Sequence, residues 1–220
     1  MTVTITAFKW VPDFAQGYVR DLRPRWACHE IGLDYEERLI DSDPKPESYF
    51  SEQPWGQVPV LDDTGVHLFE SGAILMHLAE KDERLMPRDP QGRASTISWL
   101  FAAFNSIEPW MFELATVDIF AKGEEWAELR RPSLLETIGA RFDRLTDALG
   151  EKGYLVGDFT VADIAMATVL REAGDTDLVA TRPALAAYVD RCLARPSFEK
   201  ALADQLAAFE KHTPQQEPAA

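Results

Sequence analysis

The hydrophobic pattern of the first 80 residues predicts short strands that alternate with helices. Runs rich in β-branched and aromatic residues have strand-like spacing at residues 4–10, 35–40, 58–61 and 66–69. Between the first two runs, Tyr18, Leu22 and Trp26 recur every fourth residue, which predicts a helix that ends at Gly32. Proline is tolerated in the first turn of a helix, so Pro24 implies that the ordered helix begins near Leu22 or is kinked there.

Turn signals organise the rest of this region. Residues 42–55 are polar and contain three prolines, so we expect an irregular segment or a short helix. Residues 62–65 read Asp-Asp-Thr-Gly, a turn that joins the third and fourth strands as a hairpin. Ser71 then opens a helix with Ile74, Leu75 and Leu78 on one face. The order of elements is therefore strand, helix, strand, irregular segment, hairpin and helix.

Beyond residue 82 the pattern is helical throughout. Residues 83–91 are charged, contain two prolines and have few apolar anchors, so they are predicted to be a domain linker. Helical patterns follow at residues 96–120 (interrupted at Pro109), 134–149, 160–171, 183–194 and 196–209. The predicted fold class is α/β plus all-α, with an N-terminal domain at 1–82, a helical domain at 92–211 and a frayed tail at 212–220.

Composition and charge narrow the class of partner. The chain has 220 residues, of which 46% are hydrophobic and 27% charged, as in globular proteins. Its 22 basic and 37 acidic residues leave a net charge of −15, so we expect neither nucleic acid nor a membrane surface as a partner. No signal peptide or membrane-spanning run is visible. Cys28 and Cys192 are far apart in the sequence, so we expect two buried free thiols and a protein that works in the reducing cytoplasm. Neither the cysteines nor the four histidines have metal-ligand spacing, so we expect no metal site.

Residues 53–61, Gln-Pro-Trp-Gly-Gln-Val-Pro-Val-Leu, form the first candidate site. Proline cannot donate a hydrogen bond to a neighbouring strand, so Pro59 marks either an ordinary trans edge position or a cis bond. If the Val58–Pro59 bond is cis, the N–H and C=O of Val58 can turn outward together. They can then pair with the backbone of a bound peptide, as an added strand would. The sequence leaves both interpretations open.

The dipeptide Glu70-Ser71 is the second candidate site. Ser71 is a natural N-cap for the helix that follows. Free N–H groups at a helix start bind a carboxylate, the hydroxyl adds a donor, and Glu70 can hold an ammonium group. The pair can therefore bind an amino-acid head group, and plain helix capping without a ligand is the alternative.

A third segment, residues 159–164, has the spacing of a capping box. With Thr160 as N-cap, Asp163 falls at the third helical position, from which its carboxylate reaches back to the Thr160 N–H. Phe159 and Ile164 fit a hydrophobic staple around this cap. We assign this segment to folding and not to catalysis.

The three segments, in this order and at these separations, resemble the soluble glutathione transferase superfamily. Arg23, Trp26 and Ala27 before Gly32 also match the family's first-helix pattern. The resemblance covers nearly the whole chain. It implies a thioredoxin-like N-terminal domain, an all-helical C-terminal domain, a cleft between them and a homodimer.

The resemblance also implies glutathione as a co-substrate. Its cysteinyl backbone would meet Val58 in the segment 53–61, which we call the proline strand. Its γ-glutamyl group would meet Glu70 and Ser71, and its glycyl end would meet two glutamines. The implied glutathione contacts are Gln53, Gln57, Val58, Pro59, Glu70 and Ser71. A small hydrophobic electrophile would lie against Trp10, Phe14, Phe104, Trp110 and Met111. Ordinary core packing is the alternative for these apolar side chains.

The position that faces the glutathione sulfur departs from the family's pattern. The family places Ser, Cys or Tyr there, and counting back from Trp26 without gaps gives Tyr18, after a longer loop than usual. Arg20 or a backbone N–H can take the same role. A free thiol has a pKa near 8.5, so one of these groups must favour the thiolate, which then attacks an electrophilic carbon or a disulfide.

Three functions stay open at this point. The first is a glutathione transferase, and the second is a non-catalytic interaction or stress-response module with the same fold. The third is a glutathione-dependent isomerase, dehalogenase or disulfide reductase. A resolving cysteine near the sulfur would favour a reductase, but Cys28 lies about ten residues past the junction and is expected to be buried in the helix.

Overall fold

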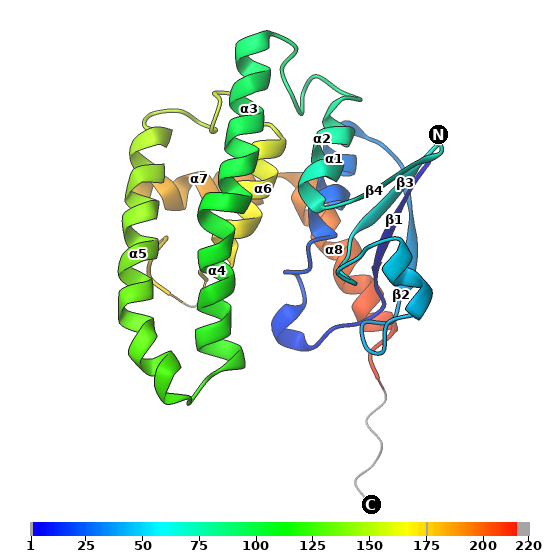
Figure 1. Ribbon diagram of the computed structural model, residues 1–220. Coiled ribbons are helices and arrows are strands. Elements are labelled where there is room, and N and C mark those ends of the chain that lie inside the picture. The colour runs from blue at the N-terminus through cyan, green and yellow to red at the C-terminus, as the bar shows by residue number, and fades with distance from the viewer. Residues whose placement is uncertain (1, 175, 215–220) are drawn as a thin grey trace, which may run out of the picture. The chain divides into compact units, whose positions relative to one another are not determined.

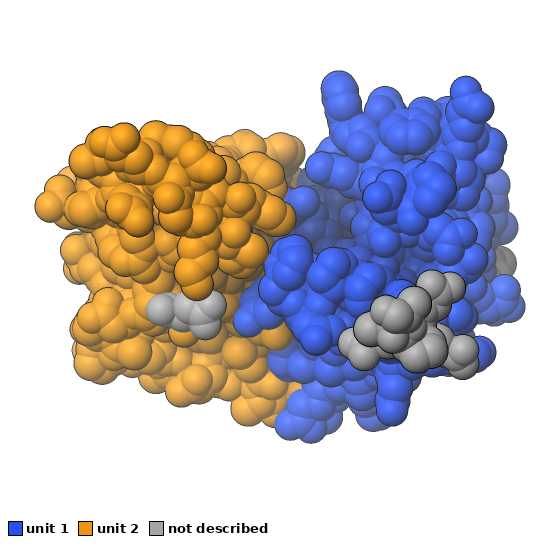
Figure 2. All heavy atoms as spheres, turned by 90° about the horizontal axis from the view of Figure 1, so that it is seen from below, with its two compact units in different colours: residues 1–78, 196–220 blue, residues 79–195 orange. Residues whose placement is uncertain are grey.

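The computed structural model describes residues 2–174 and 176–214 and divides into two compact units (Figure 2). Unit 1 is formed by residues 1–78 and 196–220, and unit 2 by residues 79–195. The last helix, α8 (Pro196–Lys211), therefore packs with the beginning of the chain, whereas the sequence pattern assigns it to the helical domain. In the predicted tail, residues 215–220 lie outside the described residues.

Unit 1 contains a four-stranded sheet in the order β2-β1-β3-β4 (Figure 1). The strands are β1 (Val3–Phe8), β2 (Tyr35–Ile40), β3 (Val60–Asp63) and β4 (Val66–Phe69). β1 runs parallel to β2 and antiparallel to β3, and β3 and β4 form the predicted hairpin. Helix α1 (Leu22–Ile31) connects the parallel strands, and α2 (Ser71–Ala79) follows the hairpin, so the predicted order of elements is confirmed.

Helix α1 has the ends that its sequence predicts. It begins at Leu22, which leaves Pro24 in the first turn, where the missing N–H costs nothing. Gly32 ends it in the left-handed conformation, at φ 69°. Short 3₁₀ turns occupy the two segments that lacked regular spacing, at Asp13–Ala15 and Glu47–Ser51. Helix α8 lies beside α1 (Figure 1).

Unit 2 is all-helical, as the pattern predicts. Its helices are α3 (Pro90–Ala102), α4 (Glu108–Ala115), α5 (Glu125–Leu149), α6 (Val161–Arg171) and α7 (Pro183–Leu193). Two π-helical segments, Ala103–Ile107 and Thr116–Phe120, flank α4 in place of an interruption at Pro109. Helix α3 begins inside the predicted linker, because Asp89 caps it by accepting from the Gly92 N–H at 2.8 Å. Leu85 and Met86, from the same linker, are buried.

Helix α6 forms the centre of unit 2, and its predicted capping box is confirmed. The Thr160 hydroxyl accepts from the N–H of Ala162, and the Asp163 carboxylate accepts from the N–H of Thr160 at 2.9 Å. Asp163 also accepts from the Leu155 N–H and from the Tyr188 hydroxyl, both at 3.0 Å. Burial raises the pKa of Asp163, although all these hydrogen bonds act in the opposite direction.

Two further sequence-level expectations concern burial and membranes. Cys28 and Cys192 are free thiols and both are buried, as predicted. Among the described ranges, no helix combines the length and the apolar character that a membrane crossing requires.

Candidate functional site

The strand register brings the two candidate segments of unit 1 together. Val60 pairs with Phe69 across the β3–β4 hairpin and with Thr6 across β1–β3. Val58 lies two residues before this pair along the chain, and Ser71 lies two residues after it. The proline strand and the start of α2 therefore lie at the same end of the sheet.

Val58 has an anchored side chain and an unpaired main chain. The Val58–Pro59 peptide bond is cis, so of the two interpretations left open by the sequence, the cis one holds. Val58 as a whole residue is 5% exposed, and it lies in an apolar cluster with Tyr49 and Val60. Neither the N–H nor the C=O of Val58 makes a hydrogen bond within residues 2–174 and 176–214. Both groups are thus available to an extended peptide.

The peptide before Val58 is held by two buried side chains. The Gln57 N–H donates to Gln53 Oε1 at 3.2 Å, and the Tyr49 hydroxyl donates to the Gln57 carbonyl at 2.7 Å. Gly56 completes the turn at φ 63°, and a Cβ there would lie 2.7 Å from the Phe50 ring. The segment that leads into Val58 is therefore preorganised, and Tyr49 is a supporting residue that the sequence pattern did not reveal.

Gln53 has a structural role in the loop, and its contact with a ligand stays a prediction. It is buried, and its side-chain oxygen accepts from the N–H groups of Trp55 and Gln57. This oxygen is therefore used inside the loop, whereas Gln57 is exposed. Gln53 supports the loop, and Gln57 stays a candidate for direct contact with a ligand.

The start of α2 has free donors, and its cap differs by one residue from the prediction. The Ile74 N–H donates to the Glu70 carbonyl at 3.0 Å, so Glu70 occupies the N-cap position and Ser71 is the first helical residue. The N–H groups of residues 71–73 make no hydrogen bond to any described residue. They form the donor set that the sequence predicts at this helix start.

Arg23 of α1 modifies this helix start, and the sequence reasoning missed it. Its Nη1 donates to Ser71 Oγ at 3.0 Å, and both side chains are buried. Because Ser71 Oγ accepts this bond and donates to no described residue, its O–H remains available as a donor. The guanidinium charge beside it attracts a carboxylate. In the sequence, Arg23 stood out only as part of the first-helix pattern of the family.

Glu70 is exposed and has an unusual backbone conformation. Its φ is 71°, in the left-handed region, where a residue with a Cβ costs about 1–2 kcal/mol relative to glycine. Non-glycine residues in this region cluster at functional sites. The exposed carboxylate next to the donors of α2 can pair with an ammonium group.

The turn before α1 carries the candidate thiol-activating residues. Tyr18 is 45% exposed, and its N–H donates to the Ala15 carbonyl at 3.0 Å. Arg20 is half-buried. Val19, between them, packs against the apolar cluster that contains Val58. This contact brings residues 18–20 beside the proline strand.

The apolar candidates divide between the two units. In unit 1, Phe14 is half-exposed, and the buried indole Nε1 of Trp10 has no hydrogen-bond partner among the described residues. In unit 2, Met111 is 1% exposed and belongs to the core. Its burial does not fit the prediction that it contacts a co-substrate. Trp110 and Phe104 are half-buried, and Trp110 lies 4.8 Å from the Arg141 guanidinium. Their contact with a co-substrate stays a prediction.

The groups at this site are suited to bind the amino-acid end of a peptide. Its polar groups are main-chain N–H and C=O groups, a hydroxyl, a carboxylate and a guanidinium, which together match a peptide with a free α-amino acid end. In the described part of the chain, no group of three His, Cys, Asp or Glu side chains is arranged to hold a metal ion.

Comparison with known proteins identifies the family. The family model for the glutathione S-transferase N-terminal domain matches residues 14–80, and that for the C-terminal domain matches residues 117–196. Glutathione S-transferase F14 of Arabidopsis thaliana is 30% identical over 196 residues, which cover 80% of this chain and 76% of the relative. A glutathione S-transferase of Hyoscyamus muticus is 30% identical over 187 residues, which cover 79% of this chain and 88% of the relative.

Solved structures share the fold. A glutathione transferase of Burkholderia graminis, crystallised with two glutathione molecules per subunit, superimposes with a TM-score of 0.80 at 23% identity, covering 98% of this chain and 90% of that one. Glutathione transferase F7 of Populus trichocarpa gives 0.79 at 22% identity, covering 93% of this chain and 99% of that one. The two matching domain models and the two relatives at 30% identity show that the chain belongs to the glutathione S-transferase family.

Proposed function

We propose that this protein is a glutathione transferase that binds glutathione at the end of the sheet in unit 1. One observation carries the proposal: the unpaired main chain of Val58 lies at the same end of the sheet as the free donors at the start of α2. An extended peptide that pairs with Val58 would thus present one end to Ser71 and Glu70. Glutathione is a peptide whose γ-glutamyl end is a free amino acid.

In the proposed complex each part of glutathione meets a different group. The cysteinyl N–H and C=O pair with the main chain of Val58, as in an added strand. The γ-glutamyl carboxylate accepts from the Ser71 hydroxyl and the α2 N–H groups, with the Arg23 charge behind them. Its ammonium group pairs with Glu70. The glycyl end lies near the exposed Gln57, which is held from inside by Gln53.

The proposed chemistry begins with loss of the thiol proton. Tyr18, through its hydroxyl, donates a hydrogen bond to the sulfur and favours the thiolate, and Arg20 or a main-chain N–H is the alternative donor. The proton passes to solvent, the sulfur lone pair forms a bond to an electrophilic carbon, and the leaving group departs with its bonding electrons. Trp10 and Phe14 are proposed to contact the small hydrophobic electrophile.

The alternative functions share the proposed glutathione site. A second thiol within reach of the sulfur would favour a disulfide reductase, but Cys28 is 0% exposed inside α1 and Cys192 is buried in unit 2. The isomerase and dehalogenase alternatives use the same thiolate and differ in the electrophile. A non-catalytic module would bind glutathione without turning over an aromatic halide.

Calorimetry with two ligands tests the proposed binding site. We expect the wild type to bind glutathione at least about tenfold more tightly than the dipeptide Cys-Gly, which lacks the γ-glutamyl group. In Glu70→Gln the advantage of glutathione should shrink, because the ammonium group loses its partner, while the affinity for Cys-Gly stays the same. Equal affinities for both ligands in the wild type would refute the site.

Thiolate absorbance against pH tests the activating group. Tyr18→Phe should raise the pKa of the bound glutathione thiol and lower the rate with an aromatic halide below that pKa. An unchanged titration would remove Tyr18 and assign the role to Arg20 or to a main-chain N–H. Absence of turnover in the wild type, with glutathione bound, would favour the non-catalytic alternative.

We also propose that the protein is a cytoplasmic homodimer. Large apolar side chains are exposed in both units, and such surfaces mark protein contacts. They include Phe50, Trp55, Phe101, Phe112, Trp126 and Leu129. Light scattering should give a mass twice the 24.7 kDa of the chain, and a mass of one chain at micromolar concentration would contradict the dimer.

A further inference from the structure

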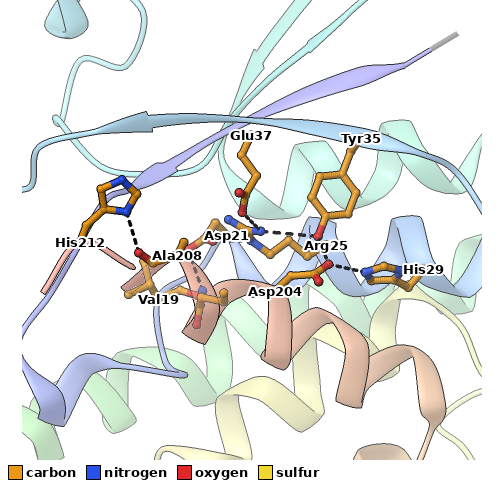
Figure 3. Close-up of polar contacts among 10 residues, drawn as sticks. Val19, Asp21, Arg25, His29, Tyr35, Glu37, Asp204, Ala208 and His212 are labelled. Carbon is orange, nitrogen blue, oxygen red and sulfur yellow. Dashed lines mark hydrogen bonds and ion pairs between the residues drawn. The ribbon is translucent and has the colours of Figure 1, made fainter. Parts of the chain in front are cut away.

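Gln205 of α8 connects the last helix to the turn that carries the candidate thiol-activating residues. It is fully buried. Its Nε2 donates to the Val19 carbonyl at 3.0 Å and to Asp21 Oδ1 at 2.8 Å. Val19 and Asp21 lie together next to α8 in Figure 3. Residues at opposite ends of the chain are thereby joined within unit 1.

The orientation of the Gln205 amide follows from its neighbours. Both neighbours, the Val19 carbonyl and the Asp21 carboxylate, are acceptors, so the NH₂ group must face them and uses both of its hydrogens. The Oε1 atom is then left buried with no partner in the described ranges. An apolar side chain of similar size would avoid that desolvation cost. The side chain is therefore most simply explained by the two hydrogen bonds that it donates.

The hydrogen bond from Gln205 to Asp21 connects α8 to α1 and β2. Asp21 Oδ2 accepts from Arg25 Nε at 2.7 Å, and Arg25 Nη1 contacts the Glu37 carboxylate and lies 3.5 Å from the Tyr35 hydroxyl (Figure 3). Burial raises the pKa of Asp21, whereas its bonds to Arg25 and Gln205 act against that rise. Asp21 is thus held from two sides at the entry to α1.

The hydrogen bond from Gln205 to the Val19 carbonyl connects α8 to the proposed glutathione site. The Val19 carbonyl accepts from Gln205 and also from the Leu22 N–H at 3.1 Å, which closes the first turn of α1. The Val19 side chain packs against the cluster of Tyr49, Val58 and Val60. One residue therefore contacts α8 through its main chain and the proline strand through its side chain.

We propose that Gln205 is a positioning residue for thiol activation, which holds residues 18–20 so that the activating group stays at the glutathione sulfur. This inference rests on the proposed function. Gln205 touches neither the thiol-activating residues' side chains nor the proposed ligand groups on Val58 and Ser71. It acts through the Val19 carbonyl and through Asp21.

The test compares Gln205→Met with the wild type. Methionine keeps the volume of glutamine and removes both donated bonds. We expect the pKa of the bound glutathione thiol to rise by about one unit, which lowers the thiolate fraction about tenfold below that pKa. The KM for glutathione should change by less than about twofold, because the binding groups are untouched. Gln205→Asn keeps an amide but is too short to reach both acceptors, and it should shift the thiol pKa in the same direction.

Asp204→Asn is the matched control on the same helix. The Asp204 carboxylate accepts from the Tyr35 hydroxyl at 2.5 Å and faces His29 at 2.7 Å, and it lines a hollow of about 580 Å³ with residues of α1 and β2. It does not contact Val19. A general loosening of α8 would therefore affect both variants, whereas the proposed role affects Gln205 variants alone.

Hydrogen exchange of the Leu22 amide reports on the positioning without any ligand. It should become faster in Gln205→Met and stay unchanged in Asp204→Asn. An unchanged thiol pKa in both Gln205 variants, or an equal shift in Asp204→Asn, would overturn the inference while leaving the proposed function standing. If the wild type does not bind glutathione, the proposed function fails. The Leu22 exchange then decides whether Gln205 holds the turn, and an unchanged rate in Gln205→Met overturns that as well.

Discussion

Asp163→Ala is the substitution whose effect on stability follows most directly from the structure. The Asp163 carboxylate is buried at the start of α6 and accepts from three buried donor residues in unit 2. Thr160 donates from its N–H, as part of the capping box, and from its hydroxyl at 3.2 Å. Leu155 donates a main-chain N–H and Tyr188 a hydroxyl, each from a different part of unit 2. Alanine would leave the buried main-chain donors and the Tyr188 hydroxyl without this acceptor.

The size of the effect can be estimated from these contacts. Each buried donor left without a partner costs about 1–3 kcal/mol, so the two main-chain N–H groups and the Tyr188 hydroxyl would together cost about 3–9 kcal/mol. Part of this is recovered, because the raised pKa of Asp163 shows that burial of the carboxylate is itself unfavourable. We therefore expect a loss of about 3–5 kcal/mol, a large share of the ~5–15 kcal/mol that stabilises a typical protein. For a chain of this length that corresponds to a fall in Tm of about 10 °C.

Urea unfolding followed by far-UV circular dichroism measures this loss, with Tyr188→Phe as the matched control. The control removes one donor and leaves the carboxylate with its other partners, so it should cost about 0.5–1.5 kcal/mol. Asp163→Asn should fall between the two, because its NH₂ group faces the Thr160 N–H. If Asp163→Ala costs no more than Tyr188→Phe, the reasoning from orphaned donors is wrong.

Three further substitutions have defined outcomes. Glu70→Gly relieves the left-handed φ of 71°, worth about 1–2 kcal/mol, while the freedom of glycine in the unfolded chain costs about 0.5–1 kcal/mol, so stability in urea should stay the same or rise by up to about 1.5 kcal/mol. The Kd for glutathione should rise about tenfold, and a loss of stability would contradict the strain argument. Tyr49→Phe removes the bond to the Gln57 carbonyl and should weaken glutathione binding about fivefold in calorimetry, with kcat unchanged; unaltered affinity would show that the loop needs no such support. For Asp204, burial alone would raise the pKa, but bonds from Tyr35 and His29 outweigh it and lower the pKa. Because the pKa of this carboxyl is lower in the folded state than its unfolded value near 3.9, the carboxylate stabilises the fold at pH values above about 3.9. This stabilisation is lost as pH falls through the folded pKa. The stability gap between wild type and Asp204→Asn should therefore narrow between pH 5 and pH 3, and a gap independent of pH would refute it.

The sequence by itself determined the features that depend on neighbours along the chain. Pro24 places the start of α1 because a proline is tolerated best in the first turn, and Gly32 ends α1 because it tolerates a positive φ. The hairpin turn at residues 62–65 and the capping box at Thr160 and Asp163 follow from residue types at fixed spacing. These are local interactions, and local chemistry is enough to predict them.

The candidate site was predictable in outline but not in its supporting contacts. The proline strand and the Glu-Ser pair could be named from the residues, and the family resemblance joined them. The conformation of the Val58–Pro59 bond, by contrast, stayed open, because both isomers suit an edge proline. The contacts of Arg23 with Ser71 and of Tyr49 with Gln57 were not predictable, because the sequence does not show which partner a buried polar side chain will contact.

The tertiary structure alone decided which distant segments meet. The apolar stripe of α8 showed that this helix is buried, but not that it packs with the first 78 residues and sends Gln205 to Val19 and Asp21. In the same way, the spacing of α4 did not show that Met111 lies in the core. A helical period specifies which face is buried but not against what, because the hydrophobic effect is non-directional and the partner depends on packing of the whole chain.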